Sequence, residues 1–316
     1  MLVWRSSLCQ RAAIVAVNRI AQRVVVRVLQ HAHSRPLESK AMLSRVLAIW
    51  LTLCALPLQA QQIAITIDDL PFVLRSRTTP QEGLKIVHDI NAAMNPYNIV
   101  ATSFAIGRHI DKETKPVMDV FTGAGHKVGN HSWSHPDYDT LTRWAFRREV
   151  RRTNRALRAW MQGPKYYRFP FLREGKTEKS RRVADTVLRN QGYVNAPVTI
   201  DNDEWQFNLE YVDALEMENQ SEPQRIAKAY LEHMKERTAH FQPRASREMG
   251  RDVSHVLLLH MNKINADHLS DLLAWYADTG WTFITLDEAL RDPLFSAPET
   301  YTGSKGLSQI ERVLGE

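Results

Sequence analysis

Residues 63–69 read IAITIDD, an unbroken run of apolar residues and threonine that ends in two aspartates. A run of this kind, without polar alternation, is typical of a strand that is buried on both faces, as in a parallel sheet. Residues 253–260, VSHVLLLH, form the strongest strand pattern of the chain and end in a histidine. The two runs predict parallel strands with polar side chains at their carboxyl ends.

Short strand-like stretches alternate with helical patterns in the remainder of residues 61–316. The other expected strands are 99–106, 127–128, 166–171, 193–200 and 281–285, and the expected helices are 84–94, 116–124, 143–161, 178–190, 223–237 and 267–277. Seven strands, most of them followed by a helix, predict an α/β fold with parallel strands. A closed barrel and an open sheet both fit this pattern.

The basic excess of the chain lies in its first 60 residues. The whole sequence has 41 Lys and Arg, 35 Asp and Glu, and a net charge of +6. Residues 1–60 hold eight of the basic residues and one acid, Glu38; 41 minus 8 leaves 33 basic residues, and 35 minus 1 leaves 34 acidic residues. The nearly neutral remainder weakens the case for a nucleic-acid partner that the total charge suggests, and we expect none.

Residues 42–60 have the layout of a secretory signal peptide. Arg45 precedes the apolar run 46–58, and Ala60 is a small residue at the expected cleavage site. The run is shorter than the roughly 20 apolar residues of a membrane span, so we expect no stable span after cleavage. A buried N-terminal helix is the alternative. The signal reading predicts a periplasmic or secreted protein, and residues 1–41 would be a targeting extension or a non-native upstream stretch.

Both cysteines, Cys9 and Cys54, also lie in the first 60 residues. A disulfide framework and a structural zinc site built on thiolates are therefore excluded. A metal in residues 61–316 would need imidazole and carboxylate ligands.

Polar residues at two strand ends have metal-binding chemistry. Asp68 and Asp69 leave the first strand in different directions, so one can ligate a metal while the other acts as a base; a turn or a helix cap is the alternative. His131 and His135 stand four residues apart and can face one metal, or they are surface or hydrogen-bonded core histidines. Together with Asp69 they make a set that suits Zn²⁺ or a neighbouring divalent ion.

Three further strand ends carry ionisable groups. Arg168 interrupts an apolar strand and needs a carboxylate partner. Residues 201–205, DNDEW, follow the fifth strand. His260 ends the strand at 253–259 and is either a capped core residue or a site residue whose pKa is tuned by burial.

Taken together, these strand ends resemble the motifs of the polysaccharide deacetylase family, the NodB-homology carbohydrate esterases of family four. The resemblance covers about residues 61–290. The matching stretches are Thr66-Ile67-Asp68-Asp69, 101–107, His131 with His135, Arg168 with Pro170 and Phe171, and Leu258-Leu259-His260. The resemblance implies a NodB-like distorted (β/α) barrel of about seven parallel strands, with residues 61–316 as the catalytic domain.

The family's activity is implied for the same residues. It is hydrolysis of a linear amide, which removes acetyl groups from the N-acetylated sugars of a polysaccharide or oligosaccharide. The implied metal ligands are Asp69, His131 and His135. The implied metal is divalent, first of all Zn²⁺, with Ni²⁺, Co²⁺ or Mn²⁺ as alternatives. The residues that would wall the acetyl-methyl pocket are Trp205 and Leu258.

The acid and base roles also come from the resemblance. Asp68 would take the proton from metal-bound water, and Arg168 would hold Asp68 in place. His260 would protonate the leaving amine, and the backbone N–H of Phe171 would stabilise the oxyanion.

The fourth family motif departs from its usual form. The family usually has an aspartate directly before the aromatic residue Trp205, where this chain has Glu204 with Asp203 one residue earlier. Either carboxylate could take this role beside His260, and the two side chains differ in length.

Several interpretations remain open at the level of sequence. An O-acetyl ester hydrolase on the same scaffold and a non-catalytic carbohydrate-binding protein are the alternatives to the deacetylase. The glycan partner and the oligomeric state are not specified. The Arg-rich helical stretch 147–158 is predicted to be a solvated face, with contact to an anionic polymer as the alternative.

Overall fold

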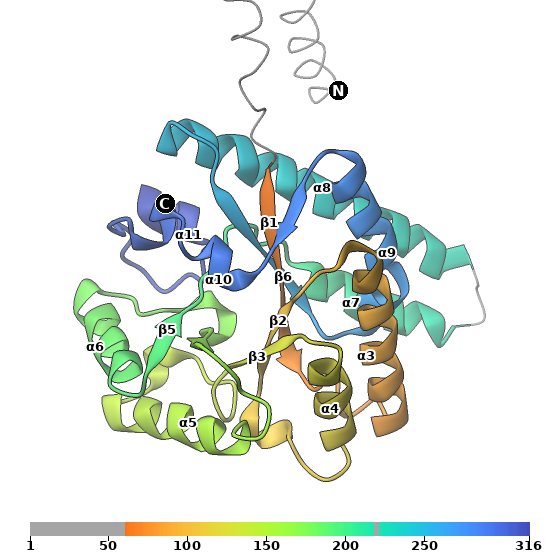
Figure 1. Ribbon diagram of the computed structural model, residues 1–316, viewed down its shortest axis with the longest axis horizontal. Helices are drawn as coiled ribbons and strands as arrows, with labels where there is room; N and C mark the ends of the chain where they lie inside the picture. The colour runs from red at the N-terminus through yellow and green to blue at the C-terminus, as the bar shows by residue number, and fades with distance from the viewer. Residues whose placement is uncertain (1–60, 218–220) are drawn as a thin grey trace, which may run out of the picture. The chain divides into compact units, whose positions relative to one another are not determined.

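The computed structural model describes residues 61–217 and 221–316, so the predictions for residues 1–60 lie outside the described part of the chain. A seven-stranded parallel sheet in the order β5-β4-β3-β2-β1-β6, with β7 paired to β1, forms the centre of the described residues (Figure 1). The strands are β1 (Gln62–Leu70), β2 (Thr102–Ala105), β3 (Lys127–Asn130), β4 (Lys165–Tyr167), β5 (Tyr193–Asn195), β6 (Ser254–His260) and β7 (Thr282–Ile284).

Helices surround this sheet. The α-helices are α3 (Pro80–Met94), α4 (Lys115–Gly123), α5 (Arg143–Ala156), α6 (Glu178–Arg189), α7 (Glu204–Leu215), α8 (Ser221–Met249), α9 (Lys263–Asp278), α10 (Leu286–Ala289) and α11 (Gln309–Leu314). The short 3₁₀ turns are η1 (Asn95–Tyr97), η2 (Gly107–His109), η3 (Tyr138–Thr140), η4 (Pro170–Leu172) and η5 (Pro293–Ser296).

The two strongest strand patterns of the sequence lie side by side. β1 pairs with β6 without interruption from Gln62 opposite Ser254 to Asp68 opposite His260. The other edge of β1 is shared, because its first residues pair with β7 and its last residues pair with β2. The register therefore brings the polar ends of both strands to one point.

The segment 193–200 joins the two edges of the sheet. Its first residues form β5 and pair with β4, whereas Ile200 pairs with Leu257 of β6. One stretch of chain thus contacts both β4 and β6, and the sheet curls into the distorted barrel that the resemblance implied. The prediction of a parallel-stranded (β/α) barrel is confirmed.

Alternation along β1 sends its two aspartates in different directions. Ile63, Ile65 and Ile67 belong to the large core cluster beneath the helices, whereas Ala64 packs into the cluster on the other face of the strand. Because successive strand residues point to opposite faces, Thr66 and Asp68 share the face of Ala64. That face is the interior of the barrel.

One expected strand is shorter in the structure, and one helix has no counterpart among the expected elements. The strand expected at 166–171 ends at Tyr167, since Pro170 has no N–H to donate and Phe171 adopts a positive φ of 58°. Helix α7 was not predicted, because its buried positions are Glu204, Asn208, Tyr211 and Ala214. Those positions have helical spacing, but two of them are polar, so the hydrophobic periodicity is missing.

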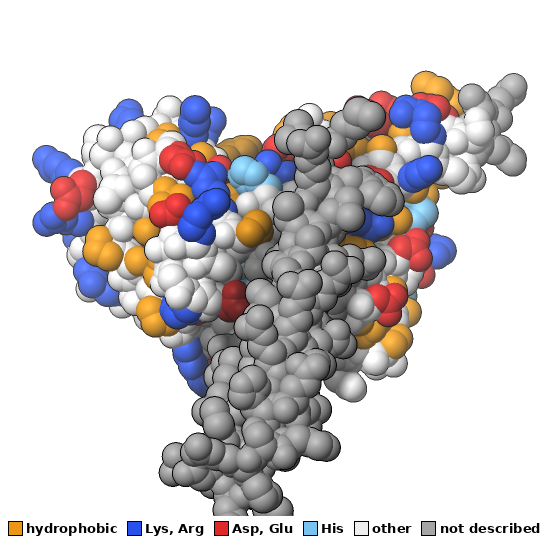
Figure 2. All heavy atoms as spheres, turned by 90° about the horizontal axis from the view of Figure 1, so that it is seen from above, with side chains coloured by type: hydrophobic (Ala, Val, Ile, Leu, Met, Phe, Trp, Pro, Cys, Tyr) orange, Lys and Arg blue, Asp and Glu red, His pale blue; other side chains and the backbone are white. Residues whose placement is uncertain are grey.

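One face of the described residues carries mixed charge. Lys and Arg side chains are interspersed with Asp and Glu on the face shown in Figure 2. Among the described residues, no helix combines the length and the apolar character needed to cross a membrane.

Substitution of a core leucine tests the packing of α9 on the sheet. We expect Leu273→Ala to lower the free energy of unfolding by about 2–5 kcal/mol, because Leu273 is fully buried and its loss leaves a cavity. Leu215→Ala is the matched control, since this side chain is 45% exposed. Urea unfolding of both variants checks the prediction, and equal losses of stability would contradict it.

Candidate active site

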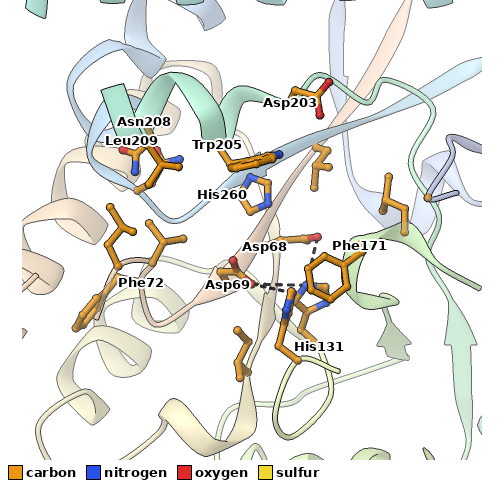
Figure 3. A pocket seen from close by; sticks show the side chains of 18 of the residues that line it. Asp68, Asp69, Phe72, His131, Phe171, Asp203, Trp205, Asn208, Leu209 and His260 are labelled. Atoms are coloured by element: carbon orange, nitrogen blue, oxygen red, sulfur yellow. Dashed lines mark ion pairs between the residues drawn. The ribbon is translucent and has the colours of Figure 1, made fainter. Parts of the chain in front are cut away.

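A pocket of about 540 Å³ opens at the carboxyl ends of the strands (Figure 3). The predicted site residues that line it are Asp68, Asp69, His131, His135, Phe171, Asp203, Trp205, Leu258 and His260. The two remaining predicted residues, Arg168 and Glu204, are buried and contact Asp68 and His260 respectively. The structure thus gathers residues from β1, the β3 loop, the β4 loop, α7 and β6.

Asp69, His131 and His135 form a cluster that can hold a metal ion. The Oδ1 atom of Asp69 lies 3.6 Å from Nε2 of each histidine, and the three candidate ligand atoms lie within 4.8 Å of one another. This Oδ1 atom is buried and has no hydrogen-bond partner among the described residues. A buried carboxylate oxygen without a donor, facing two imidazoles, fits a divalent cation.

The hydrogen bond of His131 orients it as a ligand. Its Nδ1 lies 2.9 Å from the backbone carbonyl oxygen of Arg168, so Nδ1 carries the proton and Nε2 presents its lone pair toward Asp69. Burial lowers the pKa of His131 well below its usual value. Burial also lowers the pKa of His135, against the opposing charge of Asp69. Both rings are therefore neutral at pH 7, as metal ligation requires.

The backbone of the cluster is unusual. Asp69, Ser132 and His135 have positive φ values of 64°, 66° and 57°, in a region that residues other than glycine rarely adopt. Local hydrogen bonds hold the turn: the N–H of Ser132 donates to Oδ1 of Asn130, and the N–H of His135 donates to Oγ of Ser132, both at 2.9 Å. Backbone strain of this kind occurs preferentially at functional sites.

Glu149 of α5 accepts hydrogen bonds from the same loop, between His131 and His135. Its buried Oε2 accepts hydrogen bonds from the N–H of Trp133 at 3.0 Å, from the N–H of Ser134 at 2.8 Å and from Oγ of Ser134 at 3.0 Å. One carboxylate oxygen thus fixes two of the three residues between the histidines. The sequence analysis missed this residue, since a glutamate in an arginine-rich helix looks like a surface charge.

Asp68 is paired with Arg168 inside the barrel. Nη1 of Arg168 donates to Oδ1 of Asp68 at 3.1 Å and to Oγ1 of Thr66 at 3.0 Å, and Nε donates to the carbonyl oxygen of Ala196 at 2.6 Å. Burial raises the pKa of Asp68 to about 6, even though the charge of Arg168 opposes this shift. Asp68 thus has a pKa near neutrality, which suits a group that accepts a proton.

His260 is paired with Glu204 on the other side of the pocket. Its Nδ1 lies 2.7 Å from Oε2 of Glu204, and its backbone N–H donates to Oε1 at 3.0 Å. Burial by itself would lower the pKa of His260, but the charge and the hydrogen bond of Glu204 raise it to about 10. Burial by itself would raise the pKa of Glu204. The charge of His260 and the hydrogen bonds that Glu204 accepts outweigh this effect and bring the pKa of Glu204 below its usual value.

The structure separates the two carboxylates that the sequence left as alternatives. Glu204 is fully buried against His260, whereas Asp203 is exposed at the rim of the pocket (Figure 3). Asn262 and Asn265 also donate to Oε1 of Glu204. The sequence analysis missed both asparagines; their only signal is that they follow His260 by two and five residues.

The predicted substrate-binding residues lie around the same centre. The ring of Phe171 packs edge-on against His135, with ring centroids 4.6 Å apart, and Phe171 is 55% exposed. Its backbone N–H donates to no group among the described residues. Trp205 is exposed above His260 in Figure 3, and Leu258 is buried in the wall of the pocket.

Sequence comparison finds one family model and relatives in two bacteria. The sequence model of the polysaccharide deacetylase family matches residues 56–193, so the resemblance found in the motifs is confirmed. A peptidoglycan-N-acetylglucosamine deacetylase of Bacillus cereus is 27% identical over 116 residues, which is 36% of this chain and 38% of that protein. An uncharacterized 30.6 kDa protein of Geobacillus stearothermophilus is 24% identical over 211 residues, or 66% of this chain and 67% of that protein.

Solved structures with the same fold include both an enzyme and a pseudoenzyme. A peptidoglycan N-acetylglucosamine deacetylase in complex with a naphthalenyl N-oxidanyl-benzamide has a TM-score of 0.52 and 16% identity, with 79% of this chain and 92% of that chain covered. A CE4 family pseudoenzyme from Bacillus anthracis has a TM-score of 0.50 and 17% identity, with 73% and 66% covered. At these identities the comparison establishes the fold.

Removal of Glu149 tests its support of the metal cluster. We expect Glu149→Ala to weaken Zn²⁺ binding by about 10- to 100-fold, because the donors of Trp133 and Ser134 lose their acceptor and the loop between the histidines relaxes. Titration calorimetry with Zn²⁺ measures the effect. Glu210→Ala, at an exposed position of α7, is the control, and circular dichroism checks that both variants are folded. Unchanged Zn²⁺ affinity in folded Glu149→Ala would show that Glu149 does not position the ligands.

The partner of His260 can be identified by its titration. In Glu204→Gln we expect the pKa of His260 to fall from about 10 toward its ordinary value, since the negative charge that stabilises the imidazolium is gone. Asp203→Asn should leave that pKa unchanged. NMR titration of the His260 ring in the two variants distinguishes them, and an equal fall in Asp203→Asn would assign the role to Asp203.

Proposed function

We propose that this chain is a metal-dependent hydrolase that removes acetyl groups from the N-acetylated sugars of a polysaccharide or oligosaccharide. The observation that carries the proposal is one pocket that combines an Asp-His-His cluster with two buried ion pairs, Asp68 with Arg168 and His260 with Glu204. The family match and the Bacillus cereus relative support a glycan substrate.

A metal ion would be held by Asp69 and the two histidines of the cluster. We propose Zn²⁺, because two neutral imidazoles and one carboxylate are a common zinc ligand set with room for water. Such an ion supplies Lewis-acid activation of water and of the acetyl carbonyl group.

Asp68 is the general base of the proposed reaction. With a pKa of about 6 it is mostly ionised at neutral pH, so it can accept the proton of the attacking water. Arg168 holds this carboxylate from within the barrel, and Thr66 shares the same guanidinium nitrogen. The base is therefore fixed relative to the metal cluster.

His260 is the general acid. Its raised pKa keeps the ring protonated at neutral pH, so it can donate the Nε2 proton to the leaving nitrogen while Nδ1 remains bound to Glu204. An amine is a poor leaving group, and protonation of its nitrogen as the carbon–nitrogen bond breaks lowers the barrier.

The remaining pocket residues position the acyl group. The free backbone N–H of Phe171 is the proposed donor to the oxygen that gains negative charge in the transition state. Trp205 and Leu258 provide the apolar wall for the acetyl methyl group. The signal-peptide pattern of residues 42–60 supports action outside the cytoplasm, in the periplasm or after secretion.

Acetate release tests the function. Residues 61–316, reconstituted with Zn²⁺, are expected to release acetate from N-acetylglucosamine oligomers, and a chelator should abolish the activity. Asp68→Asn should lower kcat by about 100-fold or more, since the amide cannot accept the proton. Acetylated xylan serves as the ester substrate in the same assay.

The outcomes separate the alternatives. Release from the ester alone would indicate an O-acetyl ester hydrolase. Glycan binding with no turnover after reconstitution would indicate a binding protein, and full activity in Asp68→Asn would refute the assigned base.

A further inference from the structure

Helix α5 carries a concentration of positive charge that the proposed reaction does not use. Six of its fourteen residues are arginines with exposed side chains: Arg143, Arg147, Arg148, Arg151, Arg152 and Arg155. Its one acidic residue, Glu149, is buried against the histidine loop. The exposed charges of α5 are therefore all positive, although residues 61–316 as a whole are close to neutral.

The arginines of α5 lack the ion pairs that are found on other long helices. The other surface helices pair charges three or four residues apart, as in Lys85–Asp89, Lys115–Asp119, Arg182–Glu178, Arg225–Glu222 and Lys263–Asp267. On α5, no arginine pairs with a carboxylate of residues 61–217 or 221–316. Like charges at this spacing repel one another, so an anionic partner would relieve a local destabilisation.

The spacing of the charges forms a line. Arg143, Arg147, Arg151 and Arg155 follow one another at four-residue intervals, which places them in a row about 18 Å long. Trp144 stands beside the start of this row, is 74% exposed, and has the guanidinium of Arg147 5.6 Å from its ring centre. A shallow hollow runs along this side of the helix, lined by Trp144 and four of the arginines.

The row starts at the catalytic end of the barrel. β3 leads to the histidine loop, and α5 then crosses back toward β4, so its first turn lies at the end of the strands where the pocket opens. Arg173 lines the pocket and pairs with Asp137, five residues before the cap of α5 at Thr142. A polymer that follows the row from Arg155 to Arg143 therefore approaches the rim of the pocket.

We propose that this row of arginines, together with Trp144, binds an acidic glycan strand whose N-acetylated residues enter the pocket. The proposal rests on the proposed function and specifies its substrate class as an anionic, polymeric glycan. Guanidinium groups bind carboxylates through paired hydrogen bonds, and an exposed aromatic ring packs on the apolar face of a sugar. The face offers a single large apolar side chain, which favours a strand over insertion into a lipid surface.

Binding is measured first, with hyaluronan as the acidic N-acetylated polymer and an N-acetylglucosamine hexamer as the neutral comparison. We expect hyaluronan to bind more tightly than the hexamer. This advantage should disappear as salt rises from 0.1 M to 1 M, where the screening length falls from about 10 Å to about 3 Å. Duplex DNA and phosphatidylglycerol vesicles are the competing anionic partners.

Charge-reversal variants of α5 then test whether its arginines form the binding surface. The double variant Arg147→Glu with Arg151→Glu should bind hyaluronan at least about tenfold more weakly, whereas Arg147→Lys with Arg151→Lys should retain most of the binding. Lys228→Glu with Arg247→Glu, at exposed positions of α8, changes the net charge equally and should have no effect. Acetate release from the neutral hexamer should be the same in all variants, which also shows that they are folded.

Three results would overturn the proposal. These are equal binding of hyaluronan and hexamer, an equal loss of binding in the α8 control, and tighter α5-dependent binding of DNA or vesicles than of hyaluronan. If no substrate is turned over while hyaluronan binding still depends on α5, the proposed function fails and the binding surface stands.

Discussion

The uninterrupted pairing of β1 with β6 is the constraint on which the site depends. The register sets Asp68 directly opposite His260, and alternation along β1 turns Asp68 into the barrel while Ile67 packs under the helices. A shift of one residue would exchange these faces and remove the aspartate from Arg168. The position of the proposed base and acid thus follows from backbone hydrogen bonding and apolar burial.

Charge in the pocket is organised as two ion pairs beside a cluster whose two histidines are neutral. Arg168 faces Asp68, Glu204 faces His260, and the two cluster histidines are kept neutral by burial. Each buried ion has an oppositely charged partner, and Arg168 and Glu204 make further hydrogen bonds, which offset the cost of burial. The same pairs move the pKa values of Asp68 and His260 apart, so the proposed base is ionised and the proposed acid is protonated at one pH.

Helix α5 has different chemistry on its two sides. Its buried side holds Glu149 against the loop of His131 and His135, and its exposed side is a row of unpaired arginines. Phe146 and Val150 anchor the helix in the core between these faces. One helix therefore supports the loop of the Asp-His-His cluster and presents the surface that we assign to an acidic glycan.

The amino-acid order alone determined the parallel strands, the strand-end aspartates and histidines, and the family resemblance, because these depend on local apolar runs and short spacings. It could not choose between Asp203 and Glu204, which are adjacent in the chain; the left-handed backbone at Asp203 leaves its side chain exposed while Glu204 turns inward as α7 begins. It also could not show that Glu149 is internal or that Asn262 and Asn265 contact Glu204. Those contacts span 15 to 61 residues, and only the packing of helices on the curled sheet brings such distant side chains within hydrogen-bond distance.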